Sequence, residues 1–390
     1  MARKMKDSGI EWIGEIPEGW ETINPKALFA QRKDRASKGE RQLTSSQQYG
    51  ILYQDEYMEL TGSKVVTVEK DFDILKHVET GDFVISMRSF QGGLEYSTKS
   101  GAISSAYVML VPNLELVYPR FYRWLLKSSV YIDALQRTTN MVRDGQAMRY
   151  SNFAQVRLFT LPLDEQKSRA DFLDLECSSI DKILFKTRSS IEEYKKLKQA
   201  VITQAVTEGT PAMFSSPHSV KLKYLISIVS GEAIRNEQLS DFGEYPVYGG
   251  GEIIGFCSQY NTSEGSLIIG RVGARCGCVT HTTCKSWATD NALIVLPTCN
   301  AKYMYYVIGH CQLNNLNTSN AQPLITSTKI KNVVVPYFSD AMQQQEIADY
   351  LDAKCAKIDG VIAKKEQLVK ELESYKKSLI YEVVTGKREV

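Results

Sequence analysis

The chain of 390 residues is long enough for two or three domains, and its composition excludes several classes of protein. Hydrophobic residues make up 43% and charged residues 24%, which is typical of a folded globular protein rather than of a disordered or collagen-like one. The formal net charge is only +2, so any binding of nucleic acid must depend on local clusters of Lys and Arg.

Membrane and secretory segments are not apparent in the sequence. No apolar run approaches the roughly 18 residues that a membrane-spanning helix needs, and the first residues lack the pattern of a signal peptide. We therefore expect a cytoplasmic protein.

Residues 1–160 form the first predicted domain, which is rich in short strands. Apolar, β-branched runs at 82–86 and 106–111 end at Gly, Pro or Asn turns, and a helix is predicted near 120–135. The segment contains 21 Lys and Arg against 19 Asp and Glu, so it is almost neutral.

Residues 161–209 are predicted to form a central helical spacer. Neither Pro nor Gly interrupts 170–206, so one helix of about 37 residues and about 55 Å is expected. Apolar residues follow the alternating 3-4 spacing of a coiled-coil seam, in which one stripe faces a partner helix. This seam contains Ile180, Ile183, Tyr194, Leu197 and Val201, with Thr187 and Ser190 as polar members.

Residues 210–338 form a second predicted β-rich domain, with strands at 266–269 and 292–296 and a helix at 302–313. The two domains align loosely: 81–88 with 265–271, 105–106 with 291–292, and Gln146 with Gln322. We expect one fold that carries different surface residues in its two copies.

Residues 339–390 are predicted to form a distal helical spacer, because they repeat the central one. Residues 170–181 return at 348–359, and the same offset of 178 holds without a gap to 384–385. The second seam contains Ile358, Val361, Lys365, Leu368, Leu372, Tyr375 and Leu379. Two such similar seams favour pairing of the two helices with each other; the alternative is that each helix packs only on its own domain.

Eight cysteines occur, of which Cys276, Cys278 and Cys284 lie near His281. A disulfide framework is not expected in a chain of this length without an export signal. The spacing of the cluster matches no common zinc pattern, so packing in a strand is favoured over a zinc site. We expect no metal site in this chain.

Two copies of one fold with different faces, separated by a rigid spacer, would recognise two different targets at a fixed separation. DNA offers such targets as half-sites whose spacing follows the helical repeat of about 34 Å.

Several segments, taken in order, carry a resemblance over essentially the whole length of the chain. These are residues 6–20, 161–209, 245–251, 270–273, 288–292 and 343–385. In these segments the chain resembles the specificity subunits of type I restriction-modification systems.

The resemblance implies an α+β chain with two β-rich target-recognition domains, each followed by a long helix, the two helices pairing as an antiparallel coiled coil. Each domain would recognise one half of a bipartite, asymmetric site in double-stranded DNA. The helices would set the gap between the halves and bind two modification subunits, which methylate adenine. Restriction subunits that translocate and cleave DNA would join this core.

The resemblance also assigns every cofactor to a partner: S-adenosylmethionine to the modification subunits, and ATP with Mg²⁺ to the restriction subunits. The residues agree, because the chain has no P-loop and no Asn-Pro-Pro-Tyr or Asp-Pro-Pro-Tyr segment of an amino-methyltransferase. The glycines at 249–251 fit a tight turn better than a phosphate-binding loop. We therefore expect a non-catalytic chain without cofactors.

Sequence-specific contacts to bases need Arg, Asn, Gln or Lys side chains. The candidates lie in turn-rich stretches of both domains: Arg88, Gln91, Arg143, Gln146 and Arg149 in the first, and Arg271, Arg275, Asn320 and Gln322 in the second. Arg88 aligns with Arg271, and such shared residues fit contacts to the DNA backbone better than contacts to bases. The alternative function is a coiled-coil assembly protein whose β domains bind other proteins, which the near-neutral charge would favour.

Overall fold

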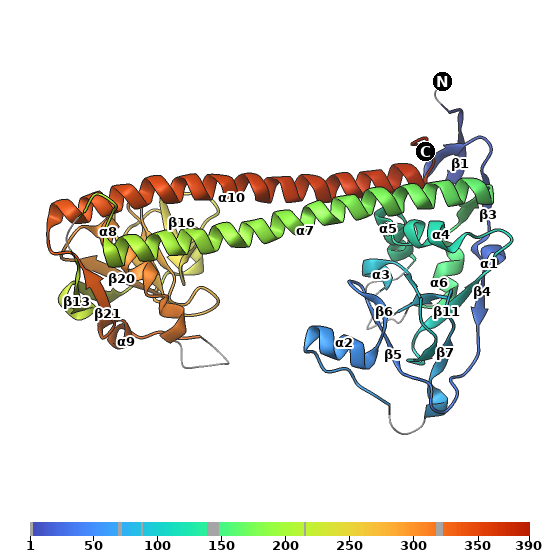
Figure 1. Cartoon of the computed structure of the whole chain (residues 1–390), viewed down its shortest axis with the longest axis horizontal. Helices are drawn as coiled ribbons and strands as arrows, with labels where there is room; N and C mark the ends of the chain where they lie inside the picture. Colours follow the sequence, from blue (N-terminus) through green and yellow to red (C-terminus); the bar gives the residue numbers. More distant parts are fainter. Residues whose placement is uncertain (1–2, 69–71, 87–88, 139–147, 214–215, 317–322) are drawn as a thin grey trace. The chain divides into compact units, whose positions relative to one another are not determined.

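The computed structural model describes the chain except for residues 1–2, 69–71, 87–88, 139–147, 214–215 and 317–322, and it does not describe the side chains of Phe90 and Gln91. Contacts divide the chain into two compact units. Unit 1 comprises Met1–Lys186 and Leu368–Val390, and unit 2 comprises Thr187–Gln367. Each unit contains one β-rich domain and parts of two long helices, α7 (Leu163–Glu208) and α10 (Ala341–Val384) (Figure 1).

The domain of unit 1 is built on the antiparallel sheet β4-β11-β8-β9. Its strands are β1 (Met5–Ile10), β2 (Gly14–Pro17), β3 (Glu21–Ile23), β4 (Phe29–Arg32), β5 (Leu43–Ser46), β6 (Gly50–Tyr53), β7 (Lys76–Val78), β8 (Phe83–Ile85), β9 (Glu95–Tyr96), β10 (Gly101–Ile103), β11 (Val108–Pro112) and β12 (Leu158–Thr160). Its helices are α1 (Pro25–Leu28), α2 (Gln54–Thr61), α3 (Ser89–Gly92), α4 (Pro119–Leu125), α5 (Ser129–Arg137) and α6 (Tyr150–Gln155).

The domain of unit 2 is built on the antiparallel sheet β14-β20-β17-β18. Its strands are β13 (His218–Lys221), β14 (Ile226–Ser230), β15 (Tyr245–Gly249), β16 (Glu252–Cys257), β17 (Leu267–Gly270), β18 (Val279–His281), β19 (Trp287–Ala288), β20 (Ala292–Pro297) and β21 (Val334–Tyr337). Its helices are α8 (Ala301–His310) and α9 (Ser327–Lys331).

The two sheets have the same order of strands when β4, β11, β8 and β9 are matched with β14, β20, β17 and β18. The pair β3–β12, which precedes α7, likewise matches β13–β21, which precedes α10. The structure therefore confirms the predicted fold class of two β-rich regions, each followed by a long helix.

Both faces of the sheets are covered at the central strands β8 and β17, which explains the apolar runs in the sequence. Alternate side chains of a strand point to opposite faces. In β8, Phe83 and Ile85 lie in the large core of unit 1, whereas Val84 lies in a second core with Met109. In β17, Leu267 and Ile269 face one core and Ile268 faces another. A strand that is buried on both sides needs a continuous run of apolar residues.

The helix predicted near residues 120–135 is in fact two helices, α4 and α5. The hydroxyl of Ser128 and its backbone N–H both donate to the carbonyl of Leu125, at 2.7 and 3.1 Å. A serine at this point can satisfy a helix end by itself, which favours a break over continuation. The predicted helix at 302–313 corresponds to α8, which ends at His310.

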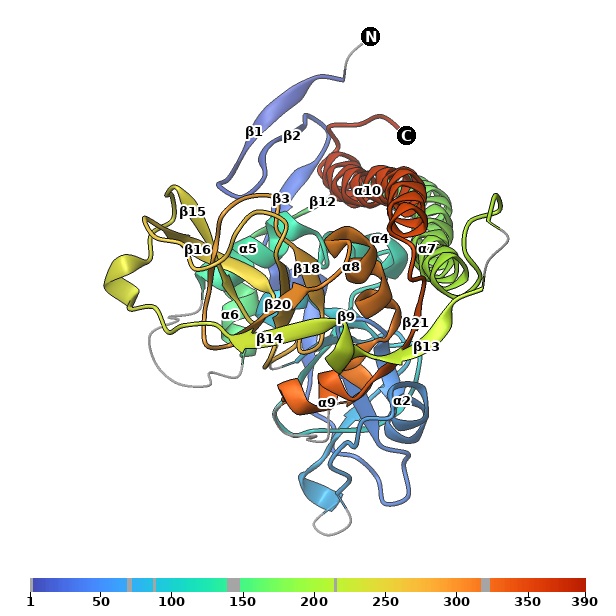
Figure 2. The same ribbon diagram turned by 90° about the vertical axis from the view of Figure 1, so that its left-hand side faces the viewer.

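The long helices lie side by side and run in opposite directions, as Figures 1 and 2 show. In unit 1 the guanidinium of Arg169 donates to the carbonyl of Val383 at 2.8 Å, and Lys376 pairs with Asp181 at 2.6 Å. In unit 2 Lys198 pairs with Asp359 at 2.7 Å. Because partner numbers fall along α10 as they rise along α7, the pair is antiparallel.

These contacts obey the sequence repeat. Asp181 corresponds to Asp359 in the repeat, and Lys198 corresponds to Lys376. The two ion pairs are therefore equivalent: in one the aspartate comes from α7 and the lysine from α10, and in the other the reverse holds. The first part of each repeat copy therefore pairs with the last part of the other copy. This result favours pairing of the helices with each other, yet the domains pack on them too.

Each domain is fixed to its following helix by an equivalent, partly buried carboxylate. In unit 1 the carboxylate of Asp174 accepts hydrogen bonds from the indole of Trp124, at 2.8 Å, and from the guanidinium of Arg120, at 2.9 Å. In unit 2 the equivalent Asp352 accepts from the hydroxyl of Tyr306 at 2.7 Å and pairs with Lys302. The interface between domain and helix is thus duplicated together with the helix.

The predicted seam and the buried stripe coincide at alternate positions only. Ile180, Ile358 and Leu379 are buried, whereas Tyr194, Val201 and Leu372 are partly buried. Leu197, Leu368 and Tyr375 are 41–48% exposed. Between the shared positions, Leu184 and Ile191 are buried while Ile183 is 47% exposed. The buried stripe therefore lies one residue away from the predicted one at every second position.

Two isoleucines on α7 test this assignment of the stripe. We expect Ile180→Ala to lower the free energy of unfolding by about 2–5 kcal/mol, because a fully packed side chain leaves a cavity. We expect Ile183→Ala to lower it by less than about 1 kcal/mol, since half of that side chain is already in water. Denaturant unfolding of the full chain, followed by circular dichroism, measures both; equal losses would contradict the assignment.

Candidate nucleic-acid interface

Four segments of unit 2 meet beside the end of β17, where two candidate arginines lie. They are the turn at 249–251, the loop at 270–277, the end of the β19–β20 turn at Asn291, and residues 323–325. We call them the recognition-loop cluster. Loops held by a rigid sheet are common places for binding residues.

Glycines allow the first two segments to approach. A Cβ atom at Gly270 would lie 2.2 Å from the carbonyl oxygen of Gly250 and 2.6 Å from that of Arg275. No side chain fits between them. Gly250 and Gly251 also have φ angles of 61° and 102°, which favour glycine. The glycine run is thus a tight turn packed against the loop, as the sequence indicated.

Arg271 joins the loop to the other two segments through its backbone. Its N–H donates to the carbonyl of Asn291 at 3.0 Å, and its carbonyl accepts from the N–H of Ile325 at 3.0 Å. The thiol of the buried Cys276 donates to the same carbonyl at 3.2 Å. The Arg271 side chain is partly exposed and forms no ion pair with any residue that the structure describes. Its backbone is fixed while its charge stays available.

Arg275 lies in the same loop but has a partner. Its guanidinium pairs with the carboxylate of Glu252 at 2.9 Å, and both side chains are at least half exposed. An exposed pair of this kind contributes little stability, so a phosphate could replace the carboxylate. Glu252 becomes a neighbour of Arg275 only through the turn at 249–251, so local sequence patterns do not reveal this contact.

Asn320 and Gln322 lie outside the described residues. Their chain neighbours Pro323 and Leu324 are described, and they pair with Gly273 and Val272 of the loop. The structure thus brings the end of the 317–325 segment to Arg271.

In unit 1 most candidates cannot be placed. Arg88, Arg143 and Gln146 lie outside the described residues, and the side chain of Gln91, in α3, is not described. Arg149 is exposed at the start of α6, where its N–H donates to the Asn152 side chain at 3.0 Å. In unit 2 the short helix α9 begins differently, because the side-chain hydroxyl of Thr326 accepts from the Lys329 N–H at 3.4 Å.

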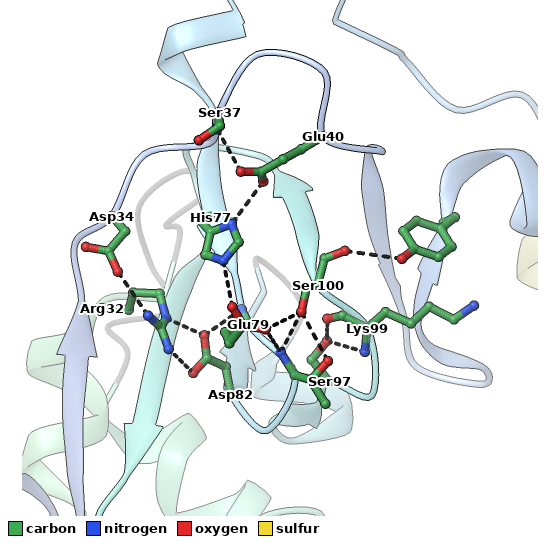
Figure 3. A network of polar contacts seen from close by, with 12 residues as sticks. Arg32, Asp34, Ser37, Glu40, His77, Glu79, Asp82, Ser97, Lys99 and Ser100 are labelled. Atoms are coloured by element: carbon green, nitrogen blue, oxygen red, sulfur yellow. Dashed lines mark hydrogen bonds and ion pairs between the residues drawn. The ribbon is translucent and has the colours of Figure 1, made fainter.

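A polar network fixes the turn that leads into β8 (Figure 3). The guanidinium of Arg32 donates to both carboxylate oxygens of Asp82, at 2.6 and 3.0 Å. The Asp82 side chain is 2% exposed, and its hydrogen bond raises the pKa of Arg32. This two-point ion pair keeps β4 and the β7–β8 turn together.

His77, on β7, lies between two carboxylates of the same network (Figure 3). Its Nδ1 is 2.9 Å from Glu40 and its Nε2 is 3.2 Å from Glu79. Burial alone would lower the pKa of His77, but the hydrogen bonds to the two carboxylates outweigh it and the pKa is raised. Hydrogen bonds from Ser100 and His77 lower the pKa of Glu79 to about 2. The imidazole of His77 therefore links the 37–40 loop to the β7–β8 turn.

The cysteine cluster has no metal-binding geometry. Cys276 is buried and Cys278 and Cys284 are exposed. Within the described parts of the chain, no group of three or more His, Cys, Asp or Glu side chains could hold a metal ion. Cys276 acts instead through its hydrogen bond to the Arg271 carbonyl.

Comparison with known proteins begins from the sequence. Residues 218–371 match the model of the type I restriction modification DNA specificity domain. A segment of 110 residues is 29% identical to the specificity subunit of the type I restriction enzyme EcoprrI from Escherichia coli. That segment is 28% of this chain and spans only 27% of the length of the relative.

Solved structures extend the likeness of fold to the whole chain. A chain from a structural study of complex assembly and conformational transition in a type I restriction-modification system matches with a TM-score of 0.71. The match covers 96% of this chain and 99% of that one, at 13% identity. The HsdS subunit of Thermoanaerobacter tengcongensis matches with a TM-score of 0.51 over 96% and 98% of the chains, at 14% identity.

Residues 218–371 thus resemble a type I restriction modification DNA specificity domain, and the whole chain has the fold of the solved HsdS subunit. Among the described residues no helix is both long enough and apolar enough to cross a membrane.

The His77 network predicts a pH dependence of stability. The folded-state pKa lies above the ordinary value of 6.5, so the stabilisation by His77 is complete below pH 6.5 and is lost as the pH rises through the folded-state pKa. We expect His77→Gln to reduce stability by about 0.5–1 kcal/mol at pH 6 and by less at pH 9. Thermal unfolding at the two pH values measures this, and a loss that grows with pH would contradict it.

Proposed function

We propose that the chain is the DNA sequence-recognition subunit of a type I restriction-modification complex. It reads a bipartite, asymmetric site in double-stranded DNA, one half with each β-rich domain. It also binds two adenine-methyltransferase subunits and the restriction subunits. The family model, which describes a DNA specificity domain, supports the coarser part of this proposal.

One observation carries the proposal: the same frame occurs twice with different loops. The two sheets share their strand order, and each is fixed to its helix through an equivalent aspartate, Asp174 or Asp352. The loop after β8, at residues 86–94, differs in sequence from the loop after the matched strand β17, at residues 270–278. Equal frames with unequal loops suit two different half-sites.

The helix pair suits the role of a spacer. α7 is 46 residues long and α10 is 44 residues long, and ion pairs tie them together in both units. A long rigid element fixes the distance between two recognition sites better than a flexible linker does. The partners bring S-adenosylmethionine, ATP and Mg²⁺, and the chain itself needs no cofactor.

The weak overall charge is compatible with this function. Specificity resides in contacts to bases, which need few residues, whereas phosphate contacts mainly determine affinity and its dependence on salt. In the complex the partner subunits would supply much of the phosphate binding.

The direct test is a map of adenine methylation. The purified chain with its cognate methyltransferase subunits and S-adenosylmethionine is incubated with DNA of random sequence, and methylated adenines are located. We expect one two-part motif with a fixed gap. A motif without a gap, or methylation that does not depend on the chain, would refute the proposal.

Arg271 provides a residue-level test of independent half-site recognition. We expect Arg271→Ala to weaken recognition of one half-site about 10- to 100-fold, the effect of losing one base or phosphate contact, and to leave the other half unchanged. Arg235→Ala is the matched control, because it removes an exposed positive charge in the same unit that belongs to none of the four segments of the recognition-loop cluster. Competition binding with DNA altered in one half at a time distinguishes the two; equal losses at both halves would contradict the prediction.

A further inference from the structure

Besides the four-stranded sheets, a β-hairpin is duplicated between the two units. In unit 2 the hairpin β15–β16 comes before β17 in the chain, and β15 pairs in parallel with the short strand β19. In unit 1 the hairpin β5–β6 comes before β8, and Gln42, just before β5, forms a parallel bridge with Ala102 of β10. In both units this parallel partner directly precedes the matched sheet strand, β20 or β11. The two hairpins are therefore equivalent.

The turn of each hairpin packs against the chain that follows a matched sheet strand. In unit 2 a Cβ atom at Gly270, at the end of β17, would lie 2.2 Å from the carbonyl oxygen of Gly250 in the turn. In unit 1 a Cβ atom at Gly92, in the helix α3 that follows β8, would lie 2.8 Å from Cγ of Gln47 in the turn. The β5–β6 turn thus occupies the place that the glycine turn occupies in the recognition-loop cluster.

The two turns differ in the side chains that they carry. In unit 2 only the glycines at 250–251 connect the strands, so the turn offers backbone groups alone. In unit 1 the connection consists of Gln47, Gln48 and Tyr49, and all three are exposed. A glutamine amide donates and accepts at the same time, which is the pattern that matches the major-groove edge of adenine. The unit 1 turn therefore carries base-reading groups at a place where unit 2 has none.

Local contacts fix the β5–β6 turn. The N–H of Tyr49 donates to the hydroxyl oxygen of Ser46 at 3.3 Å. The Tyr49 ring packs edge-to-face on Tyr57 of α2, the helix that follows β6, with ring centroids 6.5 Å apart (Figure 1). Gly50 ends the turn with a φ angle of 74°, as a three-residue hairpin loop requires. Gln48 is the middle residue of this fixed turn, and its side chain has no hydrogen bond to any residue that the structure describes.

The surroundings of the turn allow DNA to approach. A Cβ atom at Gly50 would lie 3.8 Å from Oε2 of Glu95, so a carboxylate is close to the turn. Lys127 pairs with this carboxylate at 2.7 Å, and the Glu95 side chain is only 5% exposed. The carboxylate is thus neutralised and does not repel a phosphate. A two-stranded hairpin also has a width that the major groove admits.

We propose that Gln48 reads an adenine in the half-site of unit 1, through two hydrogen bonds in the major groove. The side-chain N–H of Gln48 donates to N7 of the adenine, and its carbonyl oxygen accepts from the N6 amino group. The inference rests on the proposed function and adds a specificity-determining residue to it. Gln48 joins the candidates of unit 1 because only the hairpin brings residues 47–49 to the chain that follows β8.

Two substitutions of Gln48 test this contact, and the exposed position of the side chain leaves the core undisturbed. We expect Gln48→Ala to reduce discrimination at one adenine position of one half-site about 10- to 100-fold. Gln48→Glu should shift the preference at that position from adenine toward cytosine, because a carboxylate accepts from the N4 amino group of cytosine. Mapping of methylated adenines in DNA of random sequence, with the cognate methyltransferase subunits, measures both effects.

A base analogue ties the effect to the contact itself. 7-Deazaadenine keeps its base pairing but lacks the N7 acceptor. At the position that Gln48→Ala identifies, the analogue should weaken DNA binding by the unmodified complex about 10-fold and leave binding by the Gln48→Ala complex unchanged. If Gln48 only shaped the turn, the unmodified complex would bind both forms of DNA equally.

Gln155→Ala is the matched control. Gln155 is another exposed glutamine of unit 1, and it belongs neither to the β5–β6 turn nor to the loop after β8. This variant should keep the motif of the unmodified chain at every position. Circular dichroism of each variant verifies folding.

The outcomes separate this inference from the proposed function. If the unmodified chain directs methylation to no two-part motif, the proposed function fails and the inference fails with it. If the motif is present and neither substitution of Gln48 changes it, the function stands and the role of Gln48 is wrong. Equal losses at several positions or in both half-sites would also overturn the inference, since one base contact affects one position.

Discussion

Pairing of the start of one repeat copy with the end of the other is the constraint on which the rest of this structure depends. In unit 1 the first part of α7 packs with the last part of α10, and unit 2 holds the reverse combination. The ion pairs Asp181–Lys376 and Lys198–Asp359 also join the first part of one repeat copy to the last part of the other. Neither unit can complete its core from one repeat copy, because each core includes side chains of both long helices. Duplication of the helix thus creates two equivalent places on which a domain can be fixed.

Each domain uses its place in the same way. A carboxylate from the helix, Asp174 or Asp352, accepts hydrogen bonds from an aromatic side chain and a cation of the domain. Charge-assisted hydrogen bonds of this kind are directional, and they orient a domain more precisely than apolar packing alone. The sheet then carries its loops at a defined position relative to its own helix. The loops can therefore differ between the two domains while the frame remains the same.

In the recognition-loop cluster, too, a few contacts fix the backbone. Glycines at 250 and 270 bring two backbones together, and hydrogen bonds fix the backbone of Arg271 while its side chain remains partly exposed. A preorganised cation loses little conformational freedom on binding, so even a few such residues can discriminate between DNA sequences. A net charge of +2 therefore does not argue against binding to DNA.

The sequence by itself determined the modular plan of this protein. A repeat at a constant offset, helices without Pro or Gly over long stretches, and apolar runs between turns are local patterns, so they predicted two domains and two long helices. Tertiary structure decided which stripe of each helix is buried. Adjacent stripes through Ile183 and Leu184 both satisfy the 3-4 spacing, and only the placement of the partner helix and domain selects the second. It also decided that Arg275 meets Glu252 and that Arg271 meets residues 323–325, because these contacts join segments that local sequence patterns cannot connect.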